Sequence, residues 1–301
     1  MNSTSTSRFA ALPDPYPLVD LACHTGENPL WHPDEERLYW TDIPARRLHR
    51  CRADGQRLRT FAVDAEVGGF TLQADGALLL FMARGTVRTW RDGRFLDTVV
   101  EEIPAERDSR FNDVVADPLG RVFAGTMSSP AHGGRLYRLD PDGRLEKMAD
   151  GMGTPNGMGF SPDRLRFYQN DSRAGKTYVY RYDEAHGDLS DRRLFLHAPG
   201  TDGRGRPDGL TVDAEGCVWT ARWDGGRVTR HAPDGAGVGE MRFPVRKVTS
   251  LTLAGPDGCT AFFTTAGGGQ RSENGALAGS VFVCNDMPVR GRPEFRSCIG
   301  L

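Results

Sequence analysis

A short turn recurs along the chain at intervals in the low forties, and it constrains the fold more than any other feature of the sequence. Each copy is rich in Pro, Asp or Gly and separates two runs with the β-branched and aromatic character of strands. Residues 210–212, 213–216 and 217–220, for example, are typical of a strand, a turn and a second strand. The six turns begin at Pro33, Ala74, Pro118, Pro162, Ala214 and Pro256.

The position six residues before each turn gives a second repeated place. The six residues there are Glu27, Gly68, Asn112, Asn156, Asp208 and Ser250. They lie 41, 44, 44, 52 and 42 residues apart. A period of this size, with several short strands per repeat and no amphipathic helix pattern, is typical of the four-stranded blade of a β-propeller. We therefore predict an all-β fold, a six-bladed β-propeller of four-stranded antiparallel blades. A Trp-Asp pair occurs only at Trp223-Asp224, which argues against the WD40 type.

The repeats tile the whole chain, so we expect one domain over residues 1–301, with residues 1–15 as a polar N-terminal extension. A propeller must close its ring, because an open blade would leave unpaired strand edges. The runs 16–22 and 280–284 are the candidates for a blade shared between the two ends of the chain. The glycine-rich residues 266–279 are predicted to form a loop.

Composition narrows the function further. The formal net charge is −2 and the basic residues are scattered, which argues against a nucleic-acid partner. Residues 1–7 lack the apolar centre of a signal peptide, and no apolar run is long enough for a membrane helix. We expect a cytoplasmic protein, a monomer or weak homo-oligomer, with a small molecule as its partner and no membrane contact.

The chemistry follows from the second repeated place. The first strand of each propeller blade lines the central channel, so these six positions should converge near one mouth. Four of them carry side-chain oxygens: Glu27, Asn112, Asn156 and Asp208. Gly68 and Ser250 would leave room for a ligand. Oxygen donors suit calcium, magnesium or manganese, and a divalent cation would relieve the repulsion between two buried carboxylates. The alternative is that each residue only stabilises a local turn.

Several separate motifs resemble the gluconolactonase and regucalcin (senescence marker protein) family. They are TGENPLW at 25–31, SRFND at 109–113, FAGTM at 123–127, TPNG at 154–157 and RPDG at 206–209. The resemblance runs from about residue 20 to 265 and keeps the order of the motifs. It implies a six-bladed propeller that hydrolyses a sugar lactone with one divalent cation, calcium foremost and zinc, magnesium, manganese or iron as alternatives.

The resemblance also implies roles for single residues. Glu27, Asn156 and Asp208 match the three metal ligands of the family, and Asp208 matches its general base. Arg110 and Asn112 match substrate-contacting residues. In the mechanism that this implies, the cation polarises the lactone carbonyl while Asp208 takes a proton from the attacking water.

One departure from the family pattern leaves the lactone open. Members that act on aldonolactones often carry an acidic residue shortly after Ala-Gly-Thr-Met, whereas here Met127 is followed by Ser-Ser-Pro-Ala-His. Ser128 and His132 of this segment are accessory candidates, as is Asp171, which fits another family pattern and would line the mouth or hold the blade.

Other chemistries find little support. The chain has no Gly-x-Ser-x-Gly elbow of a serine hydrolase and no paired histidines of a zinc site. Two alternatives to a sugar lactonase stay open. One is a non-catalytic or calcium-binding regulatory propeller with a structural ion, and the other is a hydrolase of non-sugar lactones or esters.

Overall fold

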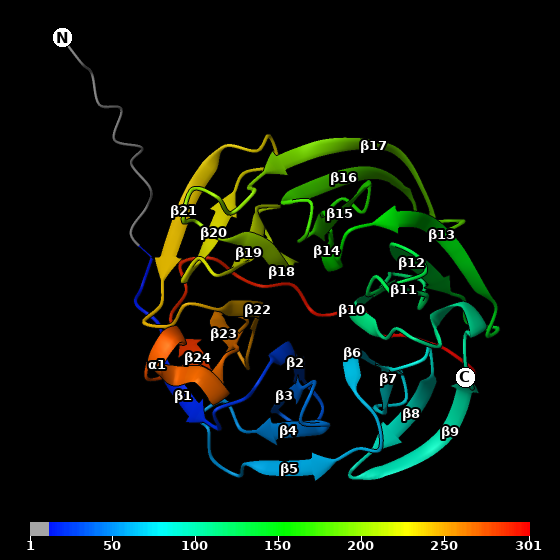
Figure 1. The fold of residues 1–301 in the computed structure, drawn as a ribbon, viewed down its shortest axis with the longest axis horizontal. Helices are drawn as coiled ribbons and strands as arrows, with labels where there is room; N and C mark the ends of the chain where they lie inside the picture. The colour runs from blue at the N-terminus through cyan, green and yellow to red at the C-terminus, as the bar shows by residue number, and fades with distance from the viewer. Residues whose placement is uncertain (1–11) are drawn as a thin grey trace.

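The computed structural model describes residues 12–301, which form six four-stranded antiparallel sheets arranged as blades around a central channel (Figure 1). The predicted six-bladed β-propeller is confirmed. In each blade one strand lies next to the axis, and the other three lie successively farther out (Figure 1). Residues 1–11, which carry most of the expected N-terminal extension and the segment tested for a signal peptide, lie outside the described residues.

Three blades come from the first half of the chain. The first contains β2 (Gly26–His32), β3 (Arg37–Asp42), β4 (Arg47–Cys51) and β5 (Arg59–Ala62). The second contains β6 (Val67–Leu72), β7 (Leu78–Met82), β8 (Val87–Arg91) and β9 (Arg94–Val100). The third contains β10 (Phe111–Ala116), β11 (Val122–Thr126), β12 (Gly134–Leu139) and β13 (Leu145–Met152), after a 3-10 turn η1 (Pro104–Glu106).

The other three blades follow in order around the ring. The fourth contains β14 (Pro155–Phe160), β15 (Arg166–Asp171), β16 (Lys176–Asp183) and β17 (Asp188–His197). The fifth contains β18 (Arg206–Val212), β19 (Val218–Trp223), β20 (Arg227–His231) and β21 (Gly237–Arg242). The sixth contains β22 (Val248–Ala254), β23 (Thr260–Thr265), β24 (Ser280–Cys284) and β1 (Tyr16–Asp20).

The sixth blade closes the ring with strands from both ends of the chain. β1 pairs antiparallel with β24, with Tyr16 opposite Val283 and Asp20 opposite Ser280. Both predicted closing runs are therefore strands of one sheet. The predicted loop at 266–279 differs in part, because it contains a 3-10 turn η2 (Gly268–Gln270) and the short helix α1 (Arg271–Asn274). No helix within residues 12–301 is long and apolar enough to span a membrane.

All six innermost strands carry an irregularity in their pairing near the start of the strand. In the fifth blade the register shifts between Pro207 and Leu210, and the other five blades shift at the equivalent place. Such bulges bend a strand and re-aim its side chains. Glycines next to them permit close approach: a Cβ on Gly157 would lie 2.4 Å from the Leu210 nitrogen, and one on Gly209 would lie 2.2 Å from Ser250 Oγ.

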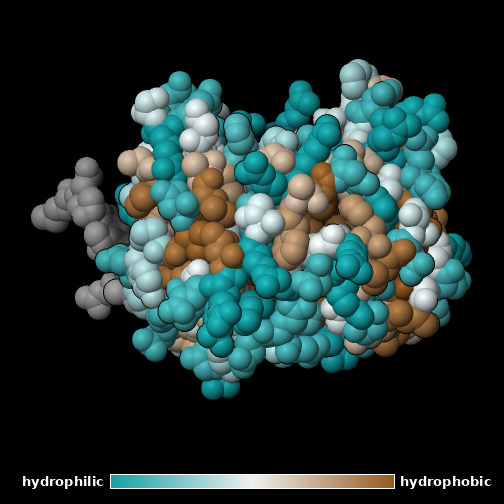
Figure 2. All heavy atoms as spheres, turned by 90° about the horizontal axis from the view of Figure 1, so that it is seen from below, coloured by the Kyte–Doolittle hydropathy of each residue, from teal (hydrophilic) through white to brown (hydrophobic). Residues whose placement is uncertain are grey.

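Aromatic side chains fill the spaces between neighbouring blades. Phe81, Phe111 and Tyr137 join the second and third blades in one buried cluster with edge-to-face ring contacts. Trp219 and Phe263 are fully buried between the fifth and sixth blades. Large buried rings are the main source of stability in such interfaces. Figure 2 shows one edge of the ring, where hydrophilic residues cover most of the surface and hydrophobic ones show between them.

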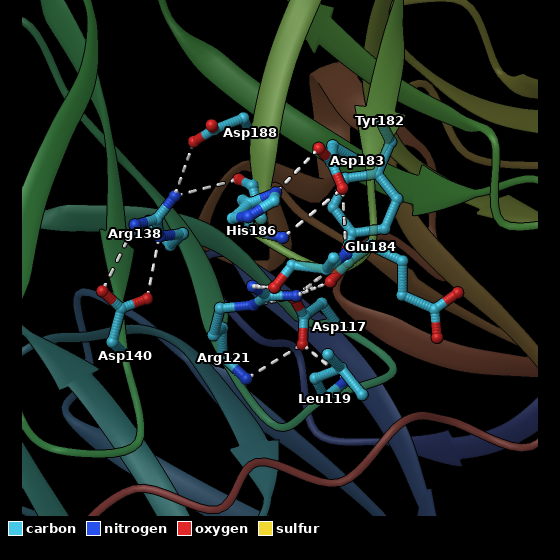
Figure 3. A network of polar contacts seen from close by, with 12 residues as sticks. Asp117, Leu119, Arg121, Arg138, Asp140, Tyr182, Asp183, Glu184, His186 and Asp188 are labelled. Carbon is cyan, nitrogen blue, oxygen red and sulfur yellow. Dashed lines mark hydrogen bonds and ion pairs between the residues drawn. The ribbon is translucent and has the colours of Figure 1, made fainter.

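A polar network also joins the third and fourth blades (Figure 3). Arg121, which is buried, forms an ion pair with Asp117 and donates to the carbonyl oxygen of Glu184 in the turn between β16 and β17. The Tyr182 hydroxyl donates to Asp117 Oδ2 at 2.7 Å. The buried charges of Asp117 and Arg121 therefore balance each other, and burial of either charge without its partner would be destabilising.

The chain ends in an irregular segment, residues 286–301, that we name the C-terminal strap. In Figure 1 it is the red coil that crosses the centre of the ring. It forms hydrogen bonds or ion pairs with one residue near the repeated turn of every blade, namely Asp34, Ala74, Gly120, Phe160, Ala214 and Gly258. The strap therefore covers one mouth of the channel, which we name the strap mouth.

Candidate functional site

The opposite mouth of the channel, which we name the site mouth, opens into a cavity of about 350 Å³. Its lining includes all five residues that the sequence predicted for the metal and the substrate: Glu27, Arg110, Asn112, Asn156 and Asp208. They come from β2, β10, β14 and β18 and from the residue before β10. Four blades thus deliver polar side chains to one cavity, because each lies near the start of an innermost strand.

Asp208 is the cavity residue that the sequence predicted to be both a metal ligand and the general base. It is buried, and β18 already begins at Arg206, so the acid lies inside the strand rather than ahead of it as the sequence suggested. Its Oδ1 accepts a hydrogen bond from Asn156 Nδ2, whereas its buried Oδ2 has no hydrogen-bond partner within residues 12–301. A buried carboxylate oxygen without a partner is costly unless a cation or a proton occupies the site.

Neighbouring blades fix the backbone and the amide around Asp208. Asn170 Nδ2 donates to the Asp208 carbonyl oxygen at 2.6 Å, and Thr177 Oγ1 donates to Asn170 Oδ1 at 2.6 Å. Asn156 Nδ2 also donates to Ser172 Oγ at 3.1 Å. These contacts run from the fourth blade to the fifth, so the position of the acid depends on how the two blades pack.

Without a cation, the protein environment disfavours the ionised form of the two carboxyl groups in the cavity. Burial raises the pKa of Glu27 well above its usual range, and the negative charges of Asp208 and Asp113 raise it further. Burial also raises the pKa of Asp208, and Asp113 adds to that shift. A divalent cation would reverse both effects, because an adjacent positive charge favours the ionised form.

The residues fit a hard cation in their donor chemistry. Glu27 and Asp208 offer carboxylate oxygens and Asn156 an amide oxygen, which is the ligand set that calcium and magnesium prefer. Asn156 now turns its Nδ2 toward Asp208. A flip of the amide, which exchanges the nitrogen and the oxygen, would present its oxygen instead.

Arg110 and Asn112 form a linked pair on the neighbouring arc. Arg110 Nη1 donates to Asn112 Oδ1 at 2.9 Å and to the Phe111 carbonyl oxygen at 2.8 Å. Its Nε lies 3.8 Å from Glu66 Oε2. Asn112 Nδ2 donates to the Pro155 carbonyl oxygen at 3.0 Å, which ties β10 to β14. The guanidinium is therefore held in place with donors left over for a ligand.

The three accessory candidates lie elsewhere. Asp171 accepts hydrogen bonds from the backbone nitrogens of Gly153 and Thr154 at 2.9 Å each, so it holds the loop that precedes Asn156. His132 contacts the carbonyl oxygens of Ala105 and Gly133. None of Asp171, Ser128 and His132 is among the residues that line the cavity.

The sequence predicted room for a ligand at Gly68 and Ser250, but neither residue lines the cavity at the site mouth. A Cβ on Gly68 would lie 1.9 Å from the Phe111 carbonyl oxygen, so the neighbouring backbone fills that place. Ser250 packs against Gly209 and lines a smaller space of about 90 Å³ toward the strap mouth. Both positions are small because innermost strands approach closely there, and the cavity opens over other residues.

Sequence reasoning missed several residues of the cavity. They lie outside the repeated place, in loops, on a second strand or at the start of an innermost strand: Thr25, Ile43, Met127, Thr154, Ser172, Arg173, Arg206 and Trp223. Arg206 and Thr154 are the first residues of the RPDG and TPNG motifs, two residues before predicted ligands, so they could have been found by considering every residue of each motif. Trp223 could have been found from strand register, since it lies opposite Arg206 in the β18–β19 pair.

The carboxylates of a second group of potential metal ligands form ion pairs with an arginine instead. Asp213, Glu215 and Cys217 lie close together in the turn after β18. Arg230 Nη2 contacts Asp213 Oδ2 at 2.7 Å and Glu215 Oε2 at 2.6 Å. The Trp219 indole also donates to Asp213. A guanidinium already balances these two carboxylates, so the arrangement does not favour a dication.

Comparison with known proteins places the chain in a family. Residues 25–267 match the family model described as the SMP-30/gluconolactonase/LRE-like region. Among solved structures, a calcium-binding protein, regucalcin, from Agrobacterium tumefaciens superposes with a TM-score of 0.83 at 25% identity. That match covers 96% of this chain and 97% of the other.

Two similar curated relatives are lactonases by name. A pentonolactonase of Haloferax volcanii is 46% identical over 293 residues, covering 94% of this chain and 98% of the relative. A 6-deoxy-6-sulfogluconolactonase of Pseudomonas putida is 36% identical over 276 residues, covering 90% and 94%. The prediction of an enzyme that hydrolyses a cyclic ester agrees with both names. The chain belongs to the SMP-30/gluconolactonase/LRE-like family, as its motifs predicted.

Proposed function

We propose that the protein is a metal-dependent lactonase that opens a sugar lactone to its hydroxy acid. One observation carries the proposal: two carboxylates, two amides and an arginine from four blades line one cavity, and Asp208 Oδ2 is buried there with no hydrogen-bond partner among residues 12–301. A structural ion would need the carboxylates but not the adjoining cavity. Kinship with two named lactonases supports the same reaction.

Glu27, Asn156 and Asp208 would hold the cation, and calcium is our first candidate because the ligands are hard oxygens. When bound, the cation supplies Lewis acidity for the lactone carbonyl and lowers the pKa of nearby water. Kinship with regucalcins, one of which is described as a calcium-binding protein, supports this choice. Zinc, magnesium, manganese and iron are the alternatives to be compared.

The chain's own residues would divide the work as follows. Asp208 accepts a proton from the attacking water, since its Oδ2 has no other partner. Asn170 and Asn156 keep that carboxylate in place through the contacts described above. Arg110 and Asn112 orient the lactone with hydrogen bonds, and Arg110 has donors to spare beyond its bond to Asn112. Proton transfer and orientation by such positioned groups account for large parts of catalytic rates.

The test is acid release from a panel of lactones by the purified protein, with and without chelator. We expect hydrolysis of a gluconolactone or a pentonolactone that stops when the cation is removed and returns when calcium is added. A non-sugar lactone in the panel separates sugar specificity from general esterase activity. The regulatory alternative gives the opposite result, a stoichiometrically bound cation and no lactone that opens faster than in buffer.

A further inference from the structure

The cavity at the site mouth has a cationic side, of which the proposed lactonase mechanism uses only Arg110. Arg110, Arg173 and Arg206 all line it. Arg110 is occupied by Asn112 and Glu66, as described above. Arg173 and Arg206 are exposed and form no side-chain hydrogen bond or ion pair within residues 12–301. Two guanidinium groups of the cavity lining therefore have free hydrogen-bond donors within residues 12–301, although the charge of Arg206 also acts on nearby Asp208.

The two arginines flank the cavity from adjacent blades. Arg206 is the first residue of β18, two positions before Asp208. Arg173 lies in the turn between β15 and β16, directly after Ser172, whose hydroxyl accepts a hydrogen bond from Asn156. Each guanidinium is thus attached next to a residue at or beside the proposed cation site, which places both within reach of the far end of a small ligand.

The wall beside Arg206 adds to the positive potential. Trp223 lies opposite Arg206 in the β18–β19 register and also lines the cavity. Lys247 Nζ lies 4.6 Å from the centre of the Trp223 ring and 3.3 Å from Asp224 Oδ1. Asp224 also contacts Arg246 at 3.0 Å. Since one carboxylate balances two cations there, this wall adds no free negative charge.

A neutral sugar lactone gains little from such a rim. Sugar hydroxyls both donate and accept hydrogen bonds, whereas arginine only donates, and the segment after Met127 supplies no carboxylate to the cavity. Lactone hydrolysis also produces a carboxylate, which two unbalanced guanidiniums would hold back after the reaction. Planar guanidinium groups match a carboxylate, phosphate or sulfonate by paired hydrogen bonds. The rim is therefore built for a substrate that already carries an anion.

We propose that Arg173 and Arg206 are specificity residues that bind an anionic group at the end of the lactone remote from the ring carbonyl. The preferred substrates are then lactones with a terminal carboxylate, phosphate or sulfonate. This inference rests on the proposed lactonase function and names the substrate class of that same site.

The experiment compares matched lactones with the calcium-loaded protein. A neutral aldonolactone is set against lactones that carry a terminal carboxylate, phosphate or sulfonate, and the three acidic compounds distinguish the anion. We expect KM to be about tenfold lower or better for at least one acidic lactone than for the neutral one, as for charge-assisted hydrogen bonds. Raising the salt concentration should weaken this preference, because the arginines are exposed.

The double variant Arg173→Gln/Arg206→Gln tests the residues themselves. We expect it to raise KM for the acidic lactone by about tenfold or more, and to raise KM for the neutral lactone by much less. Arg94→Gln, at the exposed start of the outer strand β9, is the matched control for loss of charge. Because both rim residues are exposed, the thermal unfolding midpoint should not change.

Calorimetric binding of the acids formed by hydrolysis gives a second readout that needs no turnover. The doubly charged acid should bind more tightly than the singly charged one, and the double variant should abolish the difference. Equal KM values for neutral and acidic lactones, or a double variant that leaves both unchanged, would overturn the inference while leaving the lactonase intact. If no lactone is hydrolysed, the proposed function fails, and equal binding of the two acids then rejects the rim as well.

Discussion

The two mouths of the channel lie at opposite ends of the same six innermost strands. They differ in how similar the equivalent residues are from one blade to the next. At the site mouth the equivalent positions vary around the ring, from Glu27 and Asp208 to Gly68. At the strap mouth the innermost strand of every blade ends in the same kind of turn. This turn begins six positions farther along the chain, which corresponds to about 20 Å at the rise of a β-strand. The uniform end carries the architecture, and the variable end carries the candidate site.

The strap mouth shows what uniform turns permit. One irregular segment meets all six of them, four blades through backbone hydrogen bonds and two through arginine side chains. Ser297 N, for example, donates to the Leu72 carbonyl oxygen, and Ala74 N donates to the Ser297 carbonyl oxygen, both at 2.8 Å. Ile299 is buried beneath the turns. Within residues 12–301 no such segment covers the site mouth, and polar side chains there line a cavity instead. Each prediction below changes one mouth and asks whether the other responds.

The largest effect is expected at the site mouth, for Asp208→Asn. The variant keeps the shape of the side chain but removes the charge and the basic oxygen. We expect kcat to fall by about a thousandfold, within the range for loss of a general base, and cation affinity to fall as well. Initial rates and metal content measured on the same sample check this. Unchanged turnover in a metal-replete variant would remove Asp208 from the mechanism.

Removal of the strap, residues 286–301, should instead act on stability. The segment buries Met287, Val289 and Ile299, and burial of three such side chains contributes roughly 5 kcal/mol or more to the free energy of unfolding. Thermal and denaturant unfolding measure the loss. Ile299→Ala, with an expected loss of about 2–4 kcal/mol, covers the case in which the truncated chain does not fold.

A matched control for the strap is Arg296→Gln, which removes only a partly exposed ion pair to Asp34 and should change stability by less than about 1 kcal/mol. KM for the lactone should stay the same in Ile299→Ala and Arg296→Gln. A large change in KM would show that the two mouths are coupled, contrary to the division of roles described here.

Arg121→Ala tests the turn of the third blade at the strap mouth. The substitution leaves Asp117 buried without its cation, so we expect a loss of about 3 kcal/mol in the free energy of unfolding. Arg144→Gln is the control, because Arg144 is mostly exposed and its pairing with Asp140 should contribute less than about 1 kcal/mol. Equal losses in the two variants would contradict the importance of burial.

The smallest effect is expected from pH. Burial raises the pKa of Asp113 to about 7 and raises those of Glu27 and Asp208. A carboxyl with a raised pKa holds its proton more tightly in the folded state than in the unfolded state. The stability of the chelated protein should therefore fall as pH rises from about 4 to about 7.

Thermal unfolding between pH 4 and 8, with chelator and with calcium, measures this dependence. Calcium should stabilise the protein more at the upper end of the range, because the ionised carboxylates bind it best. Asp113→Asn should flatten the curve of the chelated protein by roughly a few degrees in Tm. A chelated wild-type protein whose Tm rises between pH 5 and 7, with no flattening in Asp113→Asn, would contradict the pKa directions.

Much of the molecule could be predicted from the sequence because a repeat ties local chemistry to global position. The turn signals at Pro33 or Ala214 are local, since Pro, Asp and Gly set backbone angles by themselves. Their spacing then gave the blade, the blade count and the convergence of Glu27, Asn156 and Asp208. The closing strands followed from the need to pair every edge. The start of the strand that holds Asp208 was predicted at Leu210 but lies at Arg206, because periodicity locates a strand but not its first residue.

The remaining features depend on contacts between segments far apart in the chain. The sequence by itself determined a six-bladed propeller with oxygen-bearing side chains at one mouth. Only the tertiary structure decided that the backbone fills the space at Gly68, that the strap covers the other mouth, and that Arg173 and Arg206 line the cavity with no hydrogen bond or ion pair from their side chains within residues 12–301. The physical reason is that close approach, burial and charge balance are properties of neighbours in space, and a single sequence lists neighbours along the chain.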